Sequence, residues 1–279
     1  MLTTWTPAHM PEKEEIKTRL QTARSQLYDF QMKIKEHKIP VIVLFEGWGS
    51  SGKGSTIGKV IKNIDPHFFK VATMSAPTAE ELRYPFLYRY FKQIPEAGKF
   101  TFLDSGWMEQ TCKDCLSGEI EGEGYTQRID SIRRFERQLT DNGYLVLKFF
   151  MQIDRDEQKR REKLLLDHKD TRWRVSDFDK WQNEHYKKCA KIFSQINIRQ
   201  TGNLLQREYI LQNRNGMCLI LHGNFNIAYH SLQHLKFRPF SVTGIYDVPW
   251  CRGNIRVRQI LRKYFCTFFV MFILPFIKV

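Results

Sequence analysis

A lysine and several glycines stand at a spacing that suits the binding of phosphate groups. Gly47, Gly52 and Lys53 have the G-x-x-x-x-G-K spacing of a phosphate-binding loop, and Gly54 follows where such loops usually carry Ser or Thr. Glycines let backbone N–H groups turn toward phosphate oxygens, and the lysine adds a full positive charge. The alternative is a glycine-rich turn that only joins two elements of structure.

Two features of the sequence bear on a magnesium ion at this loop. Ser55 and Thr56 follow Gly54, so a hydroxyl shifted by one or two positions can replace the usual one. Asp104 ends an apolar run, and in phosphate-loop enzymes an acid at the end of a strand lies beside the loop and holds Mg²⁺. The alternative for Asp104 is a residue that begins a turn or caps the next helix. We expect Asp104 to be the metal ligand.

The elements around these residues must bring them to one edge of a sheet. Residues 41–45 are an unbroken apolar run, which predicts a strand buried on both faces, and residues 55–64 have helical spacing. We expect further strands at 68–73, 99–104 and 145–153, and helices at 13–37, 82–93, 125–139, 156–166 and 179–193. This order predicts a three-layer α/β domain of the phosphate-loop type with a central parallel sheet.

Net charge narrows the class of partner. The chain of 279 residues carries +14, which predicts a polyanion: nucleic acid, phosphorylated small molecules or an inorganic polyanion. Eleven Lys and Arg and only two acids follow residue 195, so this part holds +9 of the +14. No helix-turn-helix, RNA-recognition or zinc pattern is present, so we expect no nucleic-acid partner.

The cysteines and the apolar segments indicate a compartment. Cys112 and Cys115 form a C-x-x-C without a second pair at zinc spacing, which favours two ordinary thiols on one helical turn over a redox or metal site. Residues 1–10 have no apolar core of a signal peptide, and the apolar run at 264–274 is shorter than the roughly 20 residues of a spanning helix. We expect a cytoplasmic protein without a membrane role.

A basic segment follows the last predicted strand. Residues 156–166 contain Lys159, Arg160 and Arg161, and Arg172 lies in an Arg-Trp-Arg triplet after it. In a phosphate-loop enzyme such a helix can be a lid that closes over phosphates. The alternative is a charged face that is simply solvated.

Residues 13–193 resemble the family-two polyphosphate kinases. The matching segments are 45–54, 76–81 with 85–90, 94–98, 135–139, 148–150, and 156–161 with 172–176. The resemblance implies a thymidylate-kinase-like fold with a helical lid, and magnesium-dependent transfer of phosphate between inorganic polyphosphate and nucleotides. It implies catalytic roles for Lys53, Asp104 and Arg89, and phosphate or nucleotide binding by Gly47, Gly52, Lys53, Gly54, Ser55, Thr56, Arg160, Arg161 and Arg172.

Three departures from the family pattern divide the functional hypotheses. Gly49 stands where the family usually has an aspartate that helps to place magnesium and the acceptor. Ser105 and Met108 replace the arginine and tyrosine of its Asp-Arg-Ser-Trp-Tyr. These losses resemble the N-terminal half of tandem members, the polyphosphate:AMP phosphotransferases. One hypothesis is a homo-oligomeric enzyme with AMP favoured over ADP or GDP as acceptor; the other is a degenerate half that binds polyphosphate or a partner domain without turnover.

The sequence predicts three parts. Residues 1–37 form a helical lead-in, residues 38–195 the polyphosphate kinase 2-type domain, and residues 196–279 an atypical basic tail. The tail lacks the strand and closing helix with which family members continue. Two explanations stay open: a shift of reading frame near Ser194, or a divergent basic appendage.

Overall fold

A computed structural model describes residues 13–200, 209–212 and 218–222, and in it one sheet organises the fold. Its six strands have the order β2-β3-β1-β4-β6-β5. Their bounds are β1 Val41–Gly47, β2 Phe69–Thr73, β3 Phe100–Asp104, β4 Leu145–Gln152, β5 Tyr209–Gln212 and β6 Cys218–His222. The first four strands pair in parallel, which confirms the predicted central parallel sheet.

Strands β5 and β6 add an antiparallel edge to this sheet. β6 pairs with β4, so that Lys148 lies opposite His222, and β5 pairs with β6. Both strands come from the segment that the sequence assigned to the basic tail. Residues 196–200 of that tail continue α8, which also contains Ser194, near the proposed frame shift. The remaining residues of the tail, with the apolar run at 264–274, lie outside the described residues. The frame shift and the boundary at residue 195 stay predictions.

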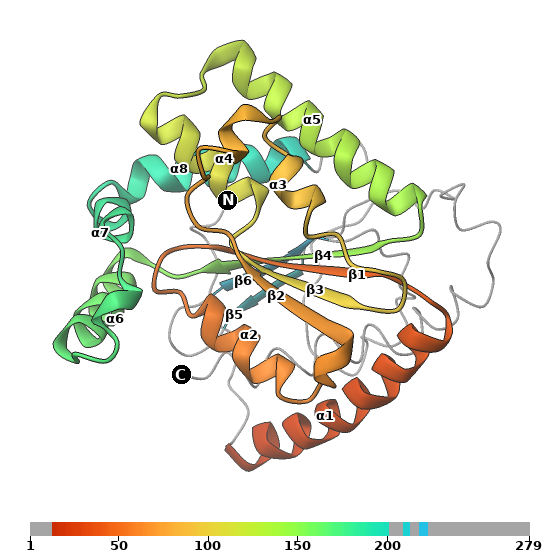
Figure 1. Cartoon of the computed structure of the whole chain (residues 1–279). Coiled ribbons are helices and arrows are strands. Elements are labelled where there is room, and N and C mark those ends of the chain that lie inside the picture. Colours follow the sequence, from red (N-terminus) through yellow and green to blue (C-terminus); the bar gives the residue numbers. More distant parts are fainter. Residues whose placement is uncertain (1–12, 201–208, 213–217, 223–279) are drawn as a thin grey trace, which may run out of the picture.

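Helices cover both faces of the sheet. They are α1 Lys13–Glu36, α2 Lys53–Ile61, α3 Tyr88–Phe91, α4 Trp107–Ser117, α5 Gly122–Asp141, α6 Arg155–Asp167, α7 Asp177–Glu184 and α8 Tyr186–Gln200, with 3₁₀ turns η1 Pro66–Phe68, η2 Glu81–Arg83 and η3 Arg172–Arg174. In Figure 1, α1 and α2 lie below the sheet, and α3, α4, α5 and α8 lie above it. The predicted three layers are therefore present, and α6 and α7 lie beyond one end of the sheet.

The core explains why β1 is apolar throughout. Every residue of β1 is buried, because β3 and β4 flank it and helices cover its two faces. Helix α1 contributes Leu27, Phe30 and Ile34 to the same core. The N-terminal helix is thus packed against the domain. In the described part of the chain, no helix has the length and apolar character needed to cross a membrane.

Two predicted helices are interrupted. The one expected at 82–93 is divided into η2 and α3, because Pro85 forces Tyr84 into an extended conformation. The one expected at 179–193 is divided into α7 and α8 at His185, and Tyr186 then stacks on Trp48 with ring centroids 4.0 Å apart. The sequence predicted a helical turn at Cys112 and Cys115 but not the full extent of α4.

Parallel pairing brings the ends of the strands to one edge. Phe45 lies opposite Asp104, and Gly47 lies opposite Met151. The chain leaves β1 at this edge and forms the glycine-rich loop before α2. The loop, the end of β3 and the end of β4 therefore meet there, and α6 follows directly after β4.

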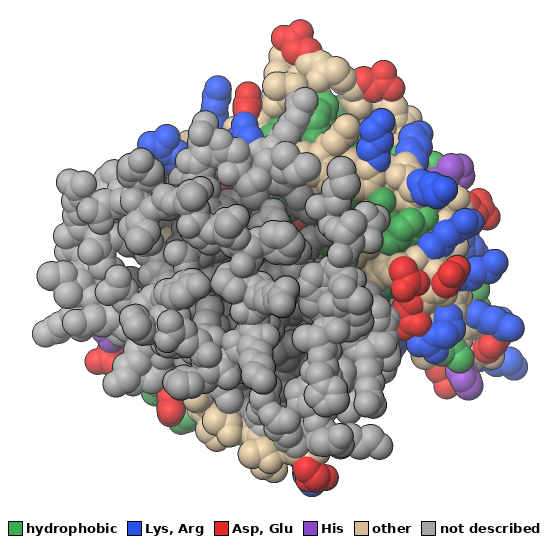
Figure 2. All heavy atoms as spheres, turned by 180° about the vertical axis from the view of Figure 1, so that it is seen from behind, with side chains coloured by type: hydrophobic (Ala, Val, Ile, Leu, Met, Phe, Trp, Pro, Cys, Tyr) green, Lys and Arg blue, Asp and Glu red, His purple; other side chains and the backbone are tan. Residues whose placement is uncertain are grey.

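The surface near this edge carries charges of both signs. Figure 2, seen from behind, shows Lys and Arg side chains interleaved with acidic ones on the side where α6 and α7 lie. The ion pairs of Glu157 with Arg160 and of Asp177 with Lys180 belong to this mixture. The predicted charged lid segment is therefore mixed in sign, and its role stays a prediction.

Candidate active site

Two glycines shape the loop between β1 and α2. Gly47 has φ of +121°, and a Cβ atom there would lie 2.8 Å from the backbone nitrogen of Met151 on β4. Gly52 has φ of +95° and caps α2 in the left-handed conformation. Both positions need glycine for conformation, and Gly47 needs it for close approach to β4 as well. The loop thus has the strand–turn–helix context of a phosphate-binding loop.

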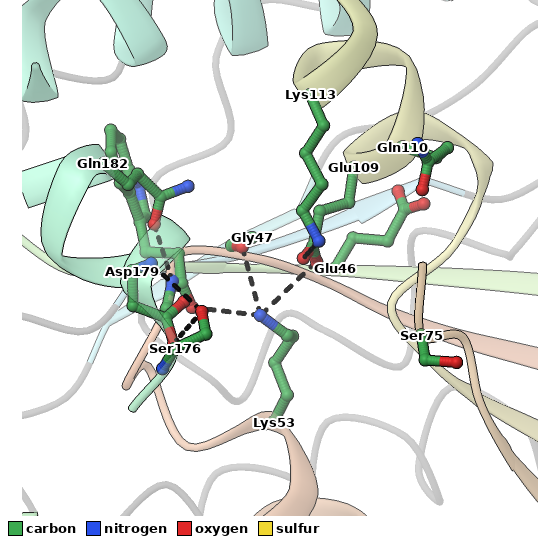
Figure 3. Close-up of polar contacts among 12 residues, drawn as sticks. Glu46, Gly47, Lys53, Ser75, Glu109, Gln110, Lys113, Ser176, Asp179 and Gln182 are labelled. Carbon is green, nitrogen blue, oxygen red and sulfur yellow. Dashed lines mark hydrogen bonds and ion pairs between the residues drawn. The ribbon is translucent and has the colours of Figure 1, made fainter. Parts of the chain in front are cut away.

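Lys53, the first residue of α2, places its ammonium group inside this loop. Its Nζ donates to the carbonyls of Gly47 and Trp48, each at 3.1 Å, and lies 3.4 Å from Glu109 Oε2 (Figure 3). Burial by itself would lower the pKa of Lys53, but the carboxylates of Glu109, Asp104 and Asp179 outweigh it and raise that pKa. The carboxylates therefore favour the charged form of Lys53, and its ammonium group lies inside the loop.

Asp104 ends β3 beside the loop, as the sequence predicted. Its Oδ2 would lie 3.2 Å from a Cβ atom added to Gly54, so a larger residue at 54 would press on the carboxylate. Burial raises the pKa of Asp104, and Lys53 partly opposes this effect. In the described residues no group of three His, Cys, Asp or Glu side chains could hold a metal by itself. The site fits Mg²⁺ held by one carboxylate, with phosphates and water as the other ligands.

Helix α4 contributes two side chains that the sequence analysis missed, Glu109 and Lys113. Glu109 is 7 % exposed, and its two oxygens lie 3.4 Å from Lys53 Nζ and 3.1 Å from Lys113 Nζ. Burial would raise the pKa of Glu109, but the two lysines outweigh it and lower that pKa. A carboxylate in the first turn of a helix that starts just after Asp104 was the available signal. Its contact with Lys53 depends on how α4 packs.

Two neighbouring arginines of α6 have different surroundings. Arg161 donates from Nη1 to the carbonyl of Ser51 at 3.0 Å, and its Nη2 is buried without a partner in the described part of the chain. Both arginines donate to Glu157, Arg161 from Nε and Arg160 from Nε and Nη2, but the Arg160 side chain is 55 % exposed and that of Arg161 is 13 % exposed. The structure therefore joins Arg161 to the phosphate loop and leaves Arg160 at the surface.

Arg172 and Arg89 contact groups other than Lys53 in the described part of the chain. Arg172 is exposed and donates to the carbonyl of Leu166 at 3.4 Å. Arg89 is buried, donates to the carbonyl of Ser75 at 2.7 Å and pairs with Glu81 at 3.5 Å. Its Nε and Nη1 are buried without a partner among the described residues. Because Ser75 follows β2, Arg89 offers these donors near the edge of the sheet that carries the loop.

The two hydroxyls after Gly54 also differ. Thr56 is buried, and its Oγ1 donates to the carbonyl of Gly52 at 3.0 Å. Ser55 is exposed and makes no side-chain hydrogen bond in the part of the chain that the structure describes. Ser55 is thus the more available of the two hydroxyls, and a shifted magnesium or phosphate contact stays a prediction.

Helices α6 and α7 hold the loop at Gly49. The N–H of Gly49 donates to Gln182 Oε1 at 2.8 Å, and its carbonyl accepts from Gln158 Nε2 at 3.4 Å. Asp179, also on α7, lies beside the same residue and acts on the charge of Lys53. The sequence analysis missed this acid; the Ser-x-x-Asp spacing from Ser176, a helix-capping pattern, was the available signal.

Residues 10–202, well over half of the chain, match the polyphosphate kinase 2 (PPK2) family. The chain belongs to this family. The match includes the phosphate loop, Asp104 and the α6–α7 segment. It confirms the resemblance on which the sequence analysis relied.

Curated members of the polyphosphate kinase 2 family give the scale of the similarity. The chain is 29% identical over 195 residues to the polyphosphate:AMP phosphotransferase of Pseudomonas syringae pv. tomato, which covers 70% of this chain and 39% of that protein. It is 29% identical over 187 residues to the GDP-polyphosphate phosphotransferase of Pseudomonas aeruginosa, which covers 65% of this chain and 52% of that protein. The chain therefore spans about two fifths to one half of these relatives.

Solved structures of the family agree with the fold. Polyphosphate kinase 2 from Arthrobacter aurescens superposes with a TM-score of 0.65 and 25% identity, over 70% of this chain and 71% of that one. A putative polyphosphate kinase 2 from Pseudomonas aeruginosa gives 0.67 and 23%, over 72% and 43%. The α/β phosphate-loop fold is thus shared.

Proposed function

We propose that this polyphosphate kinase 2 family member transfers phosphoryl groups between inorganic polyphosphate and a nucleotide, with AMP as the favoured acceptor. The observation that carries the proposal is the position of Lys53 inside the loop and next to Asp104. Relatives named as AMP, ADP and GDP phosphotransferases support this class of reaction. The similarity to AMP phosphotransferases favours AMP.

The residues have separate tasks in this proposal. Lys53 and the loop amides hold the transferring phosphoryl group, and Arg161 extends the positive region along the loop. Asp104 would hold Mg²⁺, which when bound would neutralise phosphate charge and help to orient the phosphates. Arg160 and Arg172 are proposed to contact polyphosphate farther along the lid segment. Catalysis then consists of positioning and electrostatic stabilisation, without a covalent intermediate on the protein.

Arg89 is proposed to take part in catalysis by binding a phosphate group. Its buried guanidinium has two donor atoms without a partner among the described residues, and a phosphate would satisfy them. We further propose that the protein is cytoplasmic and forms a homo-oligomer. Light scattering on the full chain would test the oligomeric state.

A degenerate, non-catalytic binding half is the second candidate. Gly49, Ser105 and Met108 favour it, since the family usually has an aspartate, an arginine and a tyrosine there. In this case polyphosphate would bind but not react.

One assay separates the two candidates. The full chain is incubated with polyphosphate, MgCl₂ and AMP, GMP, ADP or GDP in turn, and phosphorylated nucleotide is measured by chromatography. Product that depends on both polyphosphate and enzyme supports the phosphotransferase. Binding of polyphosphate without product from any nucleotide supports the non-catalytic half.

A further inference from the structure

The space for a side chain at position 49 is already filled. A Cβ atom added to Gly49 would lie 2.6 Å from Cγ and 2.8 Å from Cβ of Asp179, and nearer still to its Oδ1. Asp179 lies in the first turn of α7, and its Cβ and Cγ are close to the backbone of that helix. They therefore cannot move aside as the end of a long side chain can. A carboxylate from α7 thus occupies the volume that a loop side chain would need.

The carboxylate of Asp179 is anchored at one oxygen. Its Oδ2 accepts hydrogen bonds from the N–H and the Oγ of Ser176, each at 2.8 Å, in a capping box at the start of α7. Oδ1 is directed at Gly49, and no hydrogen bond to it is present among the described residues. The anchored oxygen fixes the orientation, and the second oxygen is left for the loop.

Asp179 also acts on the lysine of the loop. Its negative charge is one of three, with Glu109 and Asp104, that raise the pKa of Lys53. In Figure 3, Asp179 and Glu109 lie on opposite sides of the Lys53 ammonium group. A carboxylate in this position would face a phosphate bound to the lysine.

We propose that Asp179 supplies, from α7, the carboxylate that residue 49 does not provide to the phosphate-loop site, and that it helps to orient the magnesium bound to the phosphates. The inference rests on the proposed function. It changes the meaning of Gly49: the glycine accommodates an acid from another element, so it is not in itself a sign of a degenerate site. It also implies that Gly49→Asp alone would displace α7.

A binding experiment separates this role from simple helix capping. Asp179→Asn keeps an acceptor for Ser176 but removes the charge, and Asp177→Asn is the matched control because Asp177 is fully exposed and pairs with Lys180. Binding of inorganic tripolyphosphate is measured by calorimetry with and without MgCl₂. Without magnesium, Asp179→Asn is expected to bind more tightly, because a like charge near the phosphates is gone.

With magnesium the expected sign reverses. Asp179→Asn should need about 10-fold more MgCl₂ for half-maximal binding, the lower end of the loss usual for residues around a metal. Asp177→Asn should match the wild type in both conditions. An Asp179→Asn protein with wild-type magnesium dependence would overturn the proposal and leave Asp179 as a cap only.

A swap of the carboxylate gives an independent test. Asp179→Gly should lose magnesium-dependent binding and transfer, and Gly49→Asp combined with Asp179→Gly should regain part of both, because the acid returns to the space that was vacated. Thermal unfolding checks the fold, and Gly49→Asp alone should unfold at a lower temperature. No recovery in a folded double variant would contradict the proposal. If the wild type phosphorylates no nucleotide, the proposed function fails, while tripolyphosphate binding still decides the role of Asp179.

Discussion

Charged side chains reach the loop that contains Lys53 from two regions that are held in different ways. The strand side consists of Asp104 at the end of β3 and Glu109 on α4. The helix side consists of Arg161 on α6 and Asp179 on α7. On the strand side, β3 pairs residue by residue with β1, and Glu109 is buried. On the helix side, contact with the loop is made by polar bonds such as that of Arg161 with Ser51.

The difference concerns what a bound phosphate would disturb. The register of a buried parallel sheet is set by its hydrophobic faces, so the strand side keeps its place whether or not a ligand is present. On the helix side, the donors that contact the loop could bind a phosphate instead. The outer surface of this side is open, with Trp173 75 % exposed. We therefore expect the strand side to stay the same with and without phosphates, and the charges of the helix side to respond to the binding of phosphates and magnesium.

The largest effect is expected at the residue between the two sides. Lys53→Ala should reduce phosphate transfer on the order of 10³-fold or more, because the positive charge of the lysine that interacts with the phosphates is lost. It should also abolish tripolyphosphate binding. Lys62→Ala, an exposed change of equal charge at the end of α2, is the control. Circular dichroism checks the fold. Wild-type binding by a folded Lys53→Ala protein would show that the loop is only a structural turn.

Asp104→Asn tests the strand side. It should raise the MgCl₂ concentration needed for half-maximal transfer by about 10- to 100-fold, since the oxygen ligand beside the loop loses its charge. Rates measured across a range of MgCl₂ concentrations give the result, with Asp141→Asn on exposed surface as control. Rates equal to those of the wild type at every concentration would exclude Asp104 as the metal ligand.

Arg161 and Arg160 form a matched pair on the helix side. Arg161→Ala should raise the KM for polyphosphate about 10-fold, as expected for a charge-assisted hydrogen bond, because Arg161 bonds the loop. Arg160→Ala should raise it only about two- to three-fold, since Arg160 would meet polyphosphate at the surface of the lid segment, where its side chain is 55 % exposed. Equal effects of the two variants would remove the distinction drawn between them.

The last prediction is on stability and not on activity, and it concerns the buried end of β1. Burial raises the pKa of Glu46 from its usual value of 4.5 to about 8. The folded protein therefore binds this proton more tightly than the unfolded chain, and the stabilisation present below pH 4.5 is lost as pH rises toward about 8. Each pH unit in this interval costs at most about 1.4 kcal/mol.

Urea unfolding at several pH values measures this effect. Wild-type stability should fall between pH 5 and pH 8 more steeply than that of Glu46→Gln, which still accepts a hydrogen bond from the N–H of Met108. Parallel curves for the two proteins would show that Glu46 does not titrate in this range. A steep fall in the variant alone would also contradict the burial argument.

The sequence by itself determined the centre of the fold and one half of the site. An apolar run followed by Gly47, Gly52 and Lys53 is a local signal, because strand, turn and helix are formed by neighbouring residues. Asp104 could be predicted because it ends an apolar run, and parallel strands end at one edge of the sheet. The break at Pro85 also had a local cause, although the predicted helix at 82–93 ran through it.

Only the tertiary structure decided which other charges meet Lys53. Glu109 and Asp179 lie far from the loop in sequence, and their contacts depend on how α4 and α7 pack, which no spacing encodes. Arg160 and Arg161 are adjacent in sequence, yet successive residues of a helix point about 100° apart, so only one faces the loop. Packing against the loop, rather than residue type, assigned these roles.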